Sequence, residues 1–163
     1  DIFNNVVKTC QYHPNKNYLI AASGNEAIIA LIDHRHQSHQ LIENSHTQAI
    51  NTLQWNYHNE YQLLSSSFDN QILVYDIRHT NQILHSYYHV KNKKQSLTSP
   101  LFIHHDTILS ASNKSLYQHH LNNETSTANY IGFDASCLYY HQNYHKVIVA
   151  HGPKKLWLLP SNY

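Results

Sequence analysis

The chain has 163 residues, of which 41% are hydrophobic. These residues are dispersed along the chain, and no apolar run approaches the roughly 20 residues of a membrane-spanning helix. Eleven lysines and arginines against ten acidic residues give a net charge of +1, which argues against nucleic acid or a membrane as an obligatory partner. Two cysteines are too few for a disulfide framework, so we expect an intracellular protein of the cytoplasm or nucleus.

Two copies of one pattern occupy the first half of the chain. Residues 10–23 (CQYHPNKNYLIAAS) and 53–67 (LQWNYHNEYQLLSSS) each give an apolar strand, a polar turn and a second apolar strand. A third strand follows in each copy, ending LIDHR in the first and VYDIR in the second. The linking stretches 40–44 (QLIEN) and 82–88 (QILHSYY) supply a fourth strand to each copy.

The spacing of these copies is set by two pairs of residues that lie 43 positions apart: Tyr12 with Trp55, and Arg35 with Arg78. Between these anchors Ile20 matches Leu64 in the apolar pattern, which is one position out of step. We therefore expect the register to slip by one residue inside the repeat.

Two weaker copies follow in the second half. Residues 99–121 and 136–160 again read as short apolar strands separated by polar turns. Cys10 and Cys137 fall at matching strand positions in the first and fourth copies. We expect both thiols to be buried as small apolar side chains rather than to act as redox groups.

Four short strands repeated every ~40–45 residues predict the blades of a β-propeller, because each small sheet buries its apolar faces only by stacking on its neighbours. No segment shows a sustained helical period, so helices should be nearly absent. We predict an all-β fold of about four four-stranded antiparallel blades forming one segment over 1–163, with repeats at approximately 6–44, 45–88, 89–129 and 130–163.

The stretch LLSSSFDNQILVYDIR, residues 63–78, is similar to repeats of the WD-repeat family, and the resemblance extends over nearly the whole chain with decreasing fidelity. Blades of this family carry a Gly-His before the first strand, a Ser or Thr in the second, an Asp in the second turn and a closing Trp-Asp. The resemblance implies a network that pairs a buried imidazole with a carboxylate and pins the strands together. Its members here are His46, Ser65 or Ser67, Asp69 and Tyr75.

The departures from the family pattern are also informative. Tyr75 replaces the family's Trp and Ser45 its Gly, and the other three repeats lack the turn Asp. Complete propellers of this family have seven blades, which at ~40–45 residues each require about 300 residues. We therefore expect the chain to be part of a larger, seven-bladed propeller.

Residues 63–78 further resemble the box of WD-repeat proteins that act as substrate receptors of cullin–RING ubiquitin ligases. In those receptors the terminal Arg projects from a narrow rim and contacts the ligase's propeller adaptor. The resemblance implies that Arg78, with Asp76, is a partner-binding residue. Arg35, with Asp33, is the equivalent pair in the preceding repeat.

Other partners and chemistries are less favoured. Residues 55–67 resemble histone-binding WD-repeat chaperones, but the acidic surface and added helix of those chromatin factors are not visible in the sequence. The basic run Lys91-Asn92-Lys93-Lys94 reads as a solvated loop. The cluster His34, His36 and His39 could hold Zn²⁺ or Cu²⁺ only if its backbone let the rings converge, and a polar surface is the favoured interpretation.

No nucleophile elbow and no glycine-rich phosphate loop is present, so a metal-dependent enzyme is the least favoured function. We predict no catalytic, cofactor-binding or metal-binding residue. The sequence predicts a non-catalytic scaffold that presents the rims of its blades to other proteins, with the ligase receptor and the histone-binding factor as narrower alternatives.

Overall fold

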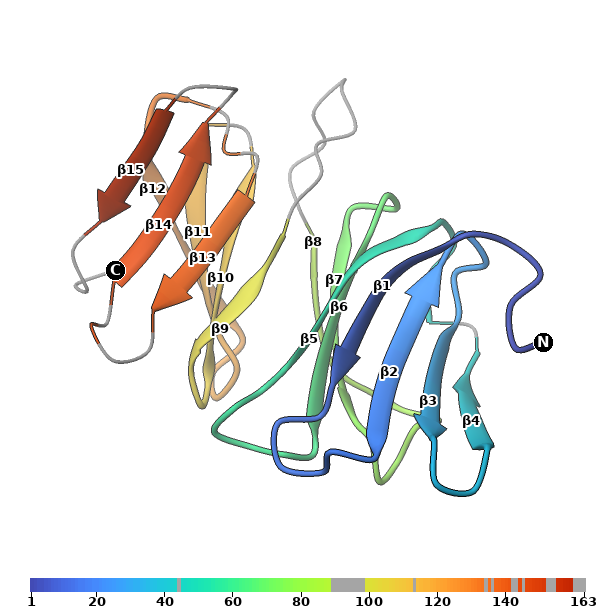
Figure 1. Cartoon of the computed structure of the whole chain (residues 1–163). Helices are drawn as coiled ribbons and strands as arrows, with labels where there is room; N and C mark the ends of the chain where they lie inside the picture. Colours follow the sequence, from blue (N-terminus) through green and yellow to red (C-terminus); the bar gives the residue numbers. More distant parts are fainter. Residues whose placement is uncertain are drawn as a thin grey trace. The chain divides into compact units, whose positions relative to one another are not determined.

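The computed structural model describes residues 1–43, 45–88, 99–112, 114–133, 135, 137–141, 144, 146–151 and 155–159. These residues form fifteen strands in four antiparallel sheets (Figure 1). No helix in these ranges is long and apolar enough to cross a membrane. The predicted all-β fold of small antiparallel sheets is therefore confirmed.

The chain divides into two compact units, Asp1–Tyr88 and His89–Tyr163, which we call unit 1 and unit 2. The boundary lies where the second predicted repeat ends. Each unit contains two sheets, and each sheet is an up-and-down meander in which consecutive strands are neighbours. The arrangement of all four repeats in one segment stays a prediction.

Unit 1 consists of two four-stranded sheets. The first sheet contains β1 (Val7–Tyr12), β2 (Leu19–Gly24), β3 (Ile29–Asp33) and β4 (Ser38–Ile42). The second sheet contains β5 (Ile50–Trp55), β6 (Gln62–Ser67), β7 (Gln71–Asp76) and β8 (Ile83–Tyr88). The predicted linking strands are thus present as β4 and β8.

Unit 2 repeats this plan with a third sheet of four strands and a fourth sheet of three. The third sheet contains β9 (Leu101–His104), β10 (Thr107–Ser112), β11 (Ser115–His120) and β12 (Thr125–Tyr130). The fourth sheet contains β13 (Cys137–His141), β14 (Lys146–His151) and β15 (Lys155–Leu159).

The first three strands of the first two sheets correspond residue for residue at a constant offset of 43. Tyr12 pairs with Ile20 across β1 and β2, and Trp55 pairs with Leu63 across β5 and β6. Ile20 therefore corresponds to Leu63, not Leu64, and the expected slip of one residue is wrong. The pairing keeps one register through the first three strands, whereas the fourth strand differs because β8 pairs with β7 through a register shift at Val74/Tyr75.

The turns between the second and third strands also repeat. Ala27, Asn70 and Lys114 lie at this turn in the first three sheets and have φ of 58°, 67° and 61°. This left-handed region is unfavourable for most side chains and is entered most readily by Gly, Asn and Asp. Three different residue types therefore adopt the same left-handed conformation immediately before or near the start of the third strand.

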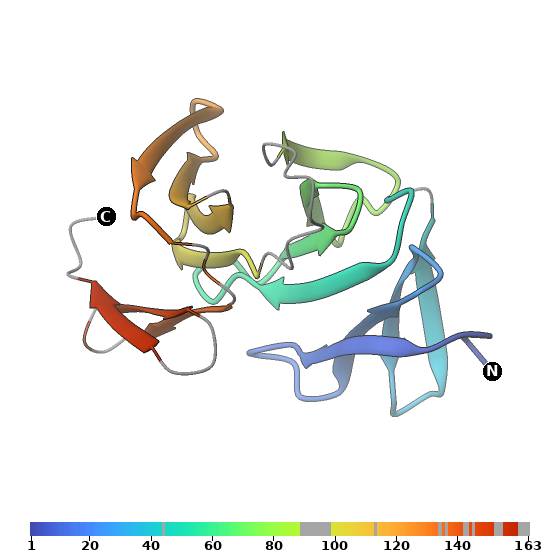
Figure 2. The same cartoon turned by 90° about the horizontal axis from the view of Figure 1, so that it is seen from above.

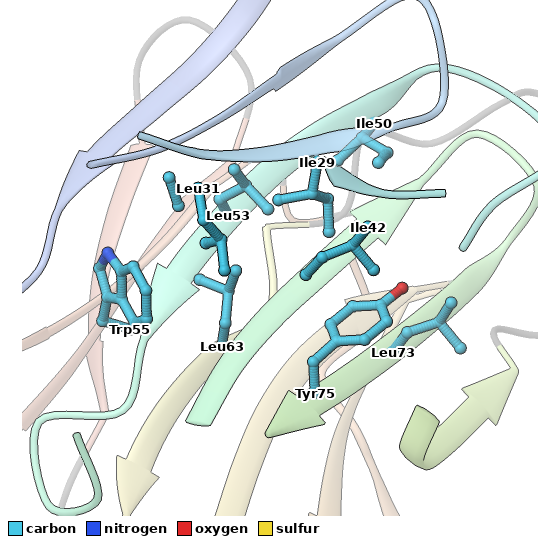
Figure 3. Packing of buried hydrophobic residues seen from close by; sticks show 10 residues of the cluster. Ile29, Leu31, Ile42, Ile50, Leu53, Trp55, Leu63, Leu73 and Tyr75 are labelled. Atoms are coloured by element: carbon cyan, nitrogen blue, oxygen red, sulfur yellow. The ribbon is translucent and has the colours of Figure 1, made fainter. Parts of the chain in front are cut away.

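The core of unit 1 lies between its two sheets (Figure 3). Ala21, Ile29, Leu31 and Ile42 come from the first sheet, and Ile50, Leu53, Trp55, Leu63, Leu73 and Tyr75 come from the second. The Trp55 Nε1–H also donates to the Gln11 carbonyl at 3.1 Å. Seen from above, β5 lies along the first sheet (Figure 2). The second sheet therefore contacts the first through its edge strand β5.

Equivalent positions in the two sheets differ in exposure. Trp55 is 2% exposed because its side chain faces the first sheet, whereas Tyr12 is 64% exposed. Cys10 lies on the same strand as Tyr12, two residues earlier, and is exposed, as is Cys137. The expectation that both cysteines are buried is wrong, since no described strand of unit 1 covers the Cys10–Tyr12 face of the first sheet.

Unit 2 has a second apolar core between the third and fourth sheets. Its buried members are Leu101, Ile103, Leu109, Ala111, Leu116, Leu138, Val147 and Val149. The Trp157 ring of β15 stacks on Phe133 at 5.4 Å. Each unit is therefore stabilised by burial between two sheets.

Leu63→Ala should lower the free energy of unfolding of unit 1 by about 2–5 kcal/mol, because it removes a fully buried side chain from the sheet–sheet core. Leu84→Ala, at a position 43% exposed on β8 of the same unit, is the matched control and should change it by less than about 1 kcal/mol. Urea unfolding followed by circular dichroism measures both. Equal effects would contradict the position of the core.

Candidate functional site

A buried imidazole lies at the interface between the two sheets of unit 1. His46 Nδ1 is 2.9 Å from Asp69 Oδ2, and His46 Nε2 is 2.7 Å from Ser65 Oγ. Because a carboxylate only accepts hydrogen bonds, Nδ1–H donates to Asp69. Nε2 of the neutral ring then accepts from the Ser65 hydroxyl. The structure thus brings together three of the residues implied by the family resemblance.

The protonation of this triad follows from its burial. Burial lowers the pKa of His46, and Asp69 offsets only part of that effect, so the ring is neutral at pH 7. Burial disfavours the ionised form of Asp69. However, backbone N–H groups of Thr47 and Gln71, with His46, outweigh it and hold the pKa of Asp69 below its usual value. An anionic carboxylate is thus stabilised by three donors.

Ser67 and Tyr75 have other roles. The Ser67 hydroxyl donates to the Gln48 carbonyl and accepts from the Asp69 N–H, so it holds the turn rather than the imidazole. Tyr75 is 1% exposed, and its phenol oxygen has no hydrogen bond of ordinary geometry among the described residues. Burial raises the pKa of Tyr75 to about 12, an effect that the nearby Ser65 and Ser45 hydroxyls partly offset.

The third sheet carries a different polar network at the matching place. His119 occupies the position of Tyr75, and Ser110 occupies that of Ser65. The His119 Nε2 lies 2.8 Å from Ser110 Oγ, and its Nδ1 lies 2.8 Å from Ser126 Oγ. In the third sheet, the serine hydroxyl is therefore bonded by an imidazole on the third strand. In the second sheet, it is bonded by an imidazole that precedes the first strand.

The first sheet has apolar residues at the two matching strand positions. Ala22 stands where the second sheet has Ser65, and Ile32 stands where it has Tyr75. At the matching turn, Glu26 accepts from the Asn4 N–H at 2.7 Å, as Asp69 accepts from the Thr47 N–H in the second sheet. The side chains of His46 and Asp69 are 0% and 4% exposed, which leaves a substrate no path to them.

Two equivalent Asp–Arg ion pairs lie at the rim of unit 1, at the ends of β3 and β7. Arg35 Nε and Nη2 donate to the two carboxylate oxygens of Asp33 at 3.1 and 2.7 Å. Arg78 forms the same fork with Asp76 at 2.9 and 2.5 Å. The fork lowers the pKa of Asp33 to about 2 and also lowers the pKa of Asp76.

Each guanidinium also lies over a tyrosine ring. Arg35 Cζ is 3.3 Å from the centre of the Tyr18 ring, and Arg78 Cζ is 4.2 Å from the centre of the Tyr61 ring. The two tyrosines are 43 residues apart and each precedes a second strand. We call the four ionic side chains with Tyr18 and Tyr61 the arginine rim. Arg35 and Arg78 are the chain's only arginines.

Sequence reasoning missed a neighbouring residue, His13. Its ring is buried against Trp55 at 4.6 Å, and its Nδ1 accepts from the backbone N–H groups of Asn15 and Lys16. Its Nε2–H therefore donates to the Glu60 carbonyl of the second sheet. Burial lowers its pKa, so this neutral ring joins the two sheets beside the rim. The 43-residue spacing to buried Asn56 could have identified it.

Two further sequence candidates are the histidine cluster and the basic run. Among the residues that the structure describes, no group of three His, Cys, Asp or Glu side chains is placed to hold a metal ion, and this includes His34, His36 and His39. His34 Nε2 instead lies 3.2 Å from the Asn17 carbonyl. The basic run Lys91-Asn92-Lys93-Lys94 lies outside the described residues.

The free energy of unfolding should decrease as the pH falls from 7 to 5. The folded-state pKa of His46 lies below its ordinary value of 6.5, so the unfolded chain binds a proton there in a range where the folded chain does not. His46→Gln should flatten this part of the profile and cost about 1–3 kcal/mol at pH 7, because it leaves a buried partner unsatisfied.

Urea unfolding at pH 7, 6 and 5 measures these profiles, with His36→Gln on the exposed surface as the control. A His46→Gln profile parallel to that of the unmodified chain would exclude a neutral, buried imidazole.

Comparison with protein families matches residues 37–76 to the WD domain, G-beta repeat. This span begins one residue before β4, includes the triad and ends at the Asp76 of the rim. No curated protein matches the chain. The sheets on either side repeat the same strand plan and register, with different residues at the polar positions. The chain therefore carries a WD40 repeat over residues 37–76, within an all-β fold of small four-stranded and three-stranded antiparallel sheets.

Proposed function

We propose that this chain is a non-catalytic platform for protein–protein contact and that a partner docks on the arginine rim. WD40 repeats mark interaction scaffolds, and the match over 37–76 supports the general assignment. The observation that carries the specific proposal is the duplicated construction of Arg, Asp and Tyr at equivalent ends of β3 and β7.

The rim is suited to recognition because its cations are ordered before a partner arrives. The Arg35 and Arg78 side chains are 49% and 54% exposed, although each is held by a carboxylate and a tyrosine ring. A guanidinium has five N–H donors, and each fork uses two of them for the neighbouring Asp. The other donors can bind carboxylate or carbonyl oxygens of a partner, at a reduced entropic cost.

A narrower candidate partner is the propeller adaptor of a cullin–RING ubiquitin ligase, which would make the chain a substrate receptor. Support comes from the sequence Tyr-Asp-x-Arg at 75–78 and from the second Asp-x-Arg at 33–35, both with the same fork geometry. No observation on the described residues favours the histone-binding alternative.

Replacing both arginines should abolish binding of this partner. Arg35→Ala with Arg78→Ala removes two anchors of the type that often contribute at least about tenfold each to affinity. Arg35→Lys with Arg78→Lys keeps the charge but loses the fork and should also weaken binding strongly. Pull-down of a purified adaptor by the full chain, quantified by titration, measures the effect.

Lys8→Ala is the matched control, since it removes a different cation stacked on an aromatic ring, that of Phe68 at 4.6 Å. It should leave recovery unchanged. Unaltered recovery by the double alanine variant would overturn the rim as the docking site. If the unmodified chain does not bind the adaptor, the ligase adaptor is excluded as the partner. That result would not contradict the general proposal of a protein–protein interaction platform.

A further inference from the structure

A pocket of about 390 Å³ lies between the outer strand of the first sheet and the β7–β8 loop of the second. We call it the β4–β8 pocket. Its apolar wall is formed by Leu41, Ile42 and Ile83. This volume is within the range of roughly 300–1,000 Å³ typical of ligand sites. Neither the buried triad nor the arginine rim uses it.

Tyr75 forms part of the wall of this pocket. Its side chain belongs to the core beside Ile42 (Figure 3), and the residue is 1% exposed. Its phenol oxygen is buried, with the Ser65 and Ser45 hydroxyls nearby. Because that oxygen has almost no accessible surface, the recognition of an occupant falls to the other side chains of the wall.

The wall also carries polar side chains, among them the Asn81 and Gln82 amides, which can both donate and accept. The Ser45 hydroxyl donates its proton to the Ala27 carbonyl at 3.1 Å, so its lone pairs remain. Glu43 is the one charged side chain on the wall, and it forms no ion pair or hydrogen bond with the residues that the structure describes. Thr80 accepts from the Gln40 amide at 2.7 Å, which ties β4 to the β7–β8 loop across the pocket.

We propose that the β4–β8 pocket receives an arginine side chain of a partner protein. The aliphatic stem would contact Leu41, Ile42 and Ile83. The guanidinium, with five donors in a fixed plane, would reach the Glu43 carboxylate and the neighbouring hydroxyl oxygens. The pocket alone supports the preference for a guanidinium group. The assignment of this group to a partner protein rests on the proposed interaction function.

The test uses the full chain and an acetylated, amidated pentapeptide with a central arginine flanked by alanines. The control peptide carries citrulline, which has nearly the same shape but no charge. Backbone amide resonances of Ser45, Thr80, Gln82 and Ile83 should shift and saturate with the arginine peptide. The citrulline peptide should bind at least about tenfold more weakly, because a charge-assisted hydrogen bond is lost. Equal binding of the two peptides, or shifts elsewhere on the chain, would overturn the proposal.

Two variants locate the contact. Glu43→Gln should weaken the arginine peptide about tenfold and leave the citrulline peptide unchanged, whereas Glu124→Gln removes an equal charge from an exposed turn and should change neither. Undiminished affinity of Glu43→Gln for the arginine peptide overturns the proposal. The Glu43→Gln variant does not alter the arginine rim, so failure of this test is distinguishable from failure of adaptor binding.

Discussion

The packing of one sheet's apolar face against the next is the interaction on which both units depend. A four-stranded sheet of about 40 residues exposes two faces and cannot exclude water from either by itself. In unit 1, the side chains of Leu53, Trp55 and Leu63 fill this role, and the Trp55 indole additionally binds the Gln11 carbonyl of the first sheet. Rigid stacking of this kind fixes where the strand ends lie, and therefore where Arg35 and Arg78 are held.

The polar positions of the repeat vary from sheet to sheet. The second sheet has an imidazole, a carboxylate and a serine, the third has His119 between two serines, and the first has apolar residues on its strands and Glu26 at its turn. Each solution leaves few buried groups without a partner, so each is compatible with the same register. Loss of the repeat signature in the sequence therefore does not imply loss of the blade.

The all-β fold and the Asp–Arg pairs of the rim could be predicted from the sequence because they depend on local signals, whereas the tyrosines under the guanidinium groups were not predicted. Alternating apolar residues and turn residues define short strands, and the Asp-x-Arg spacing alone brings the two side chains of the fork together. The internal register was harder, because the serine run Ser65–Ser67 offers several matches to the single Ser23 of the first copy. Only the ladder of backbone hydrogen bonds decides between them.

Other features depend on contacts between distant residues. The exposure of Cys10 follows from which face of the first sheet meets the second, and the sequence of β1 does not specify that choice. The β4–β8 pocket combines residues from β4, β7 and the β7–β8 loop, so no single motif encodes it. His13 escaped notice because histidine is abundant in this chain, and its burial depends on Trp55, 42 residues later.

The left-handed turns have a consequence for the order in which the chain folds. Asn70 enters this conformation readily, and its hairpin closes with bonds from the adjacent Ser67 and Asp69. Ala27 is strained at the same place, and its carbonyl is held by Ser45 from beyond the sheet. The β6–β7 turn therefore forms without backbone strain, whereas the β2–β3 turn places an alanine in a conformation that is unfavourable for it. We expect the middle of unit 1 to organise first and its amino-terminal sheet to assemble upon it.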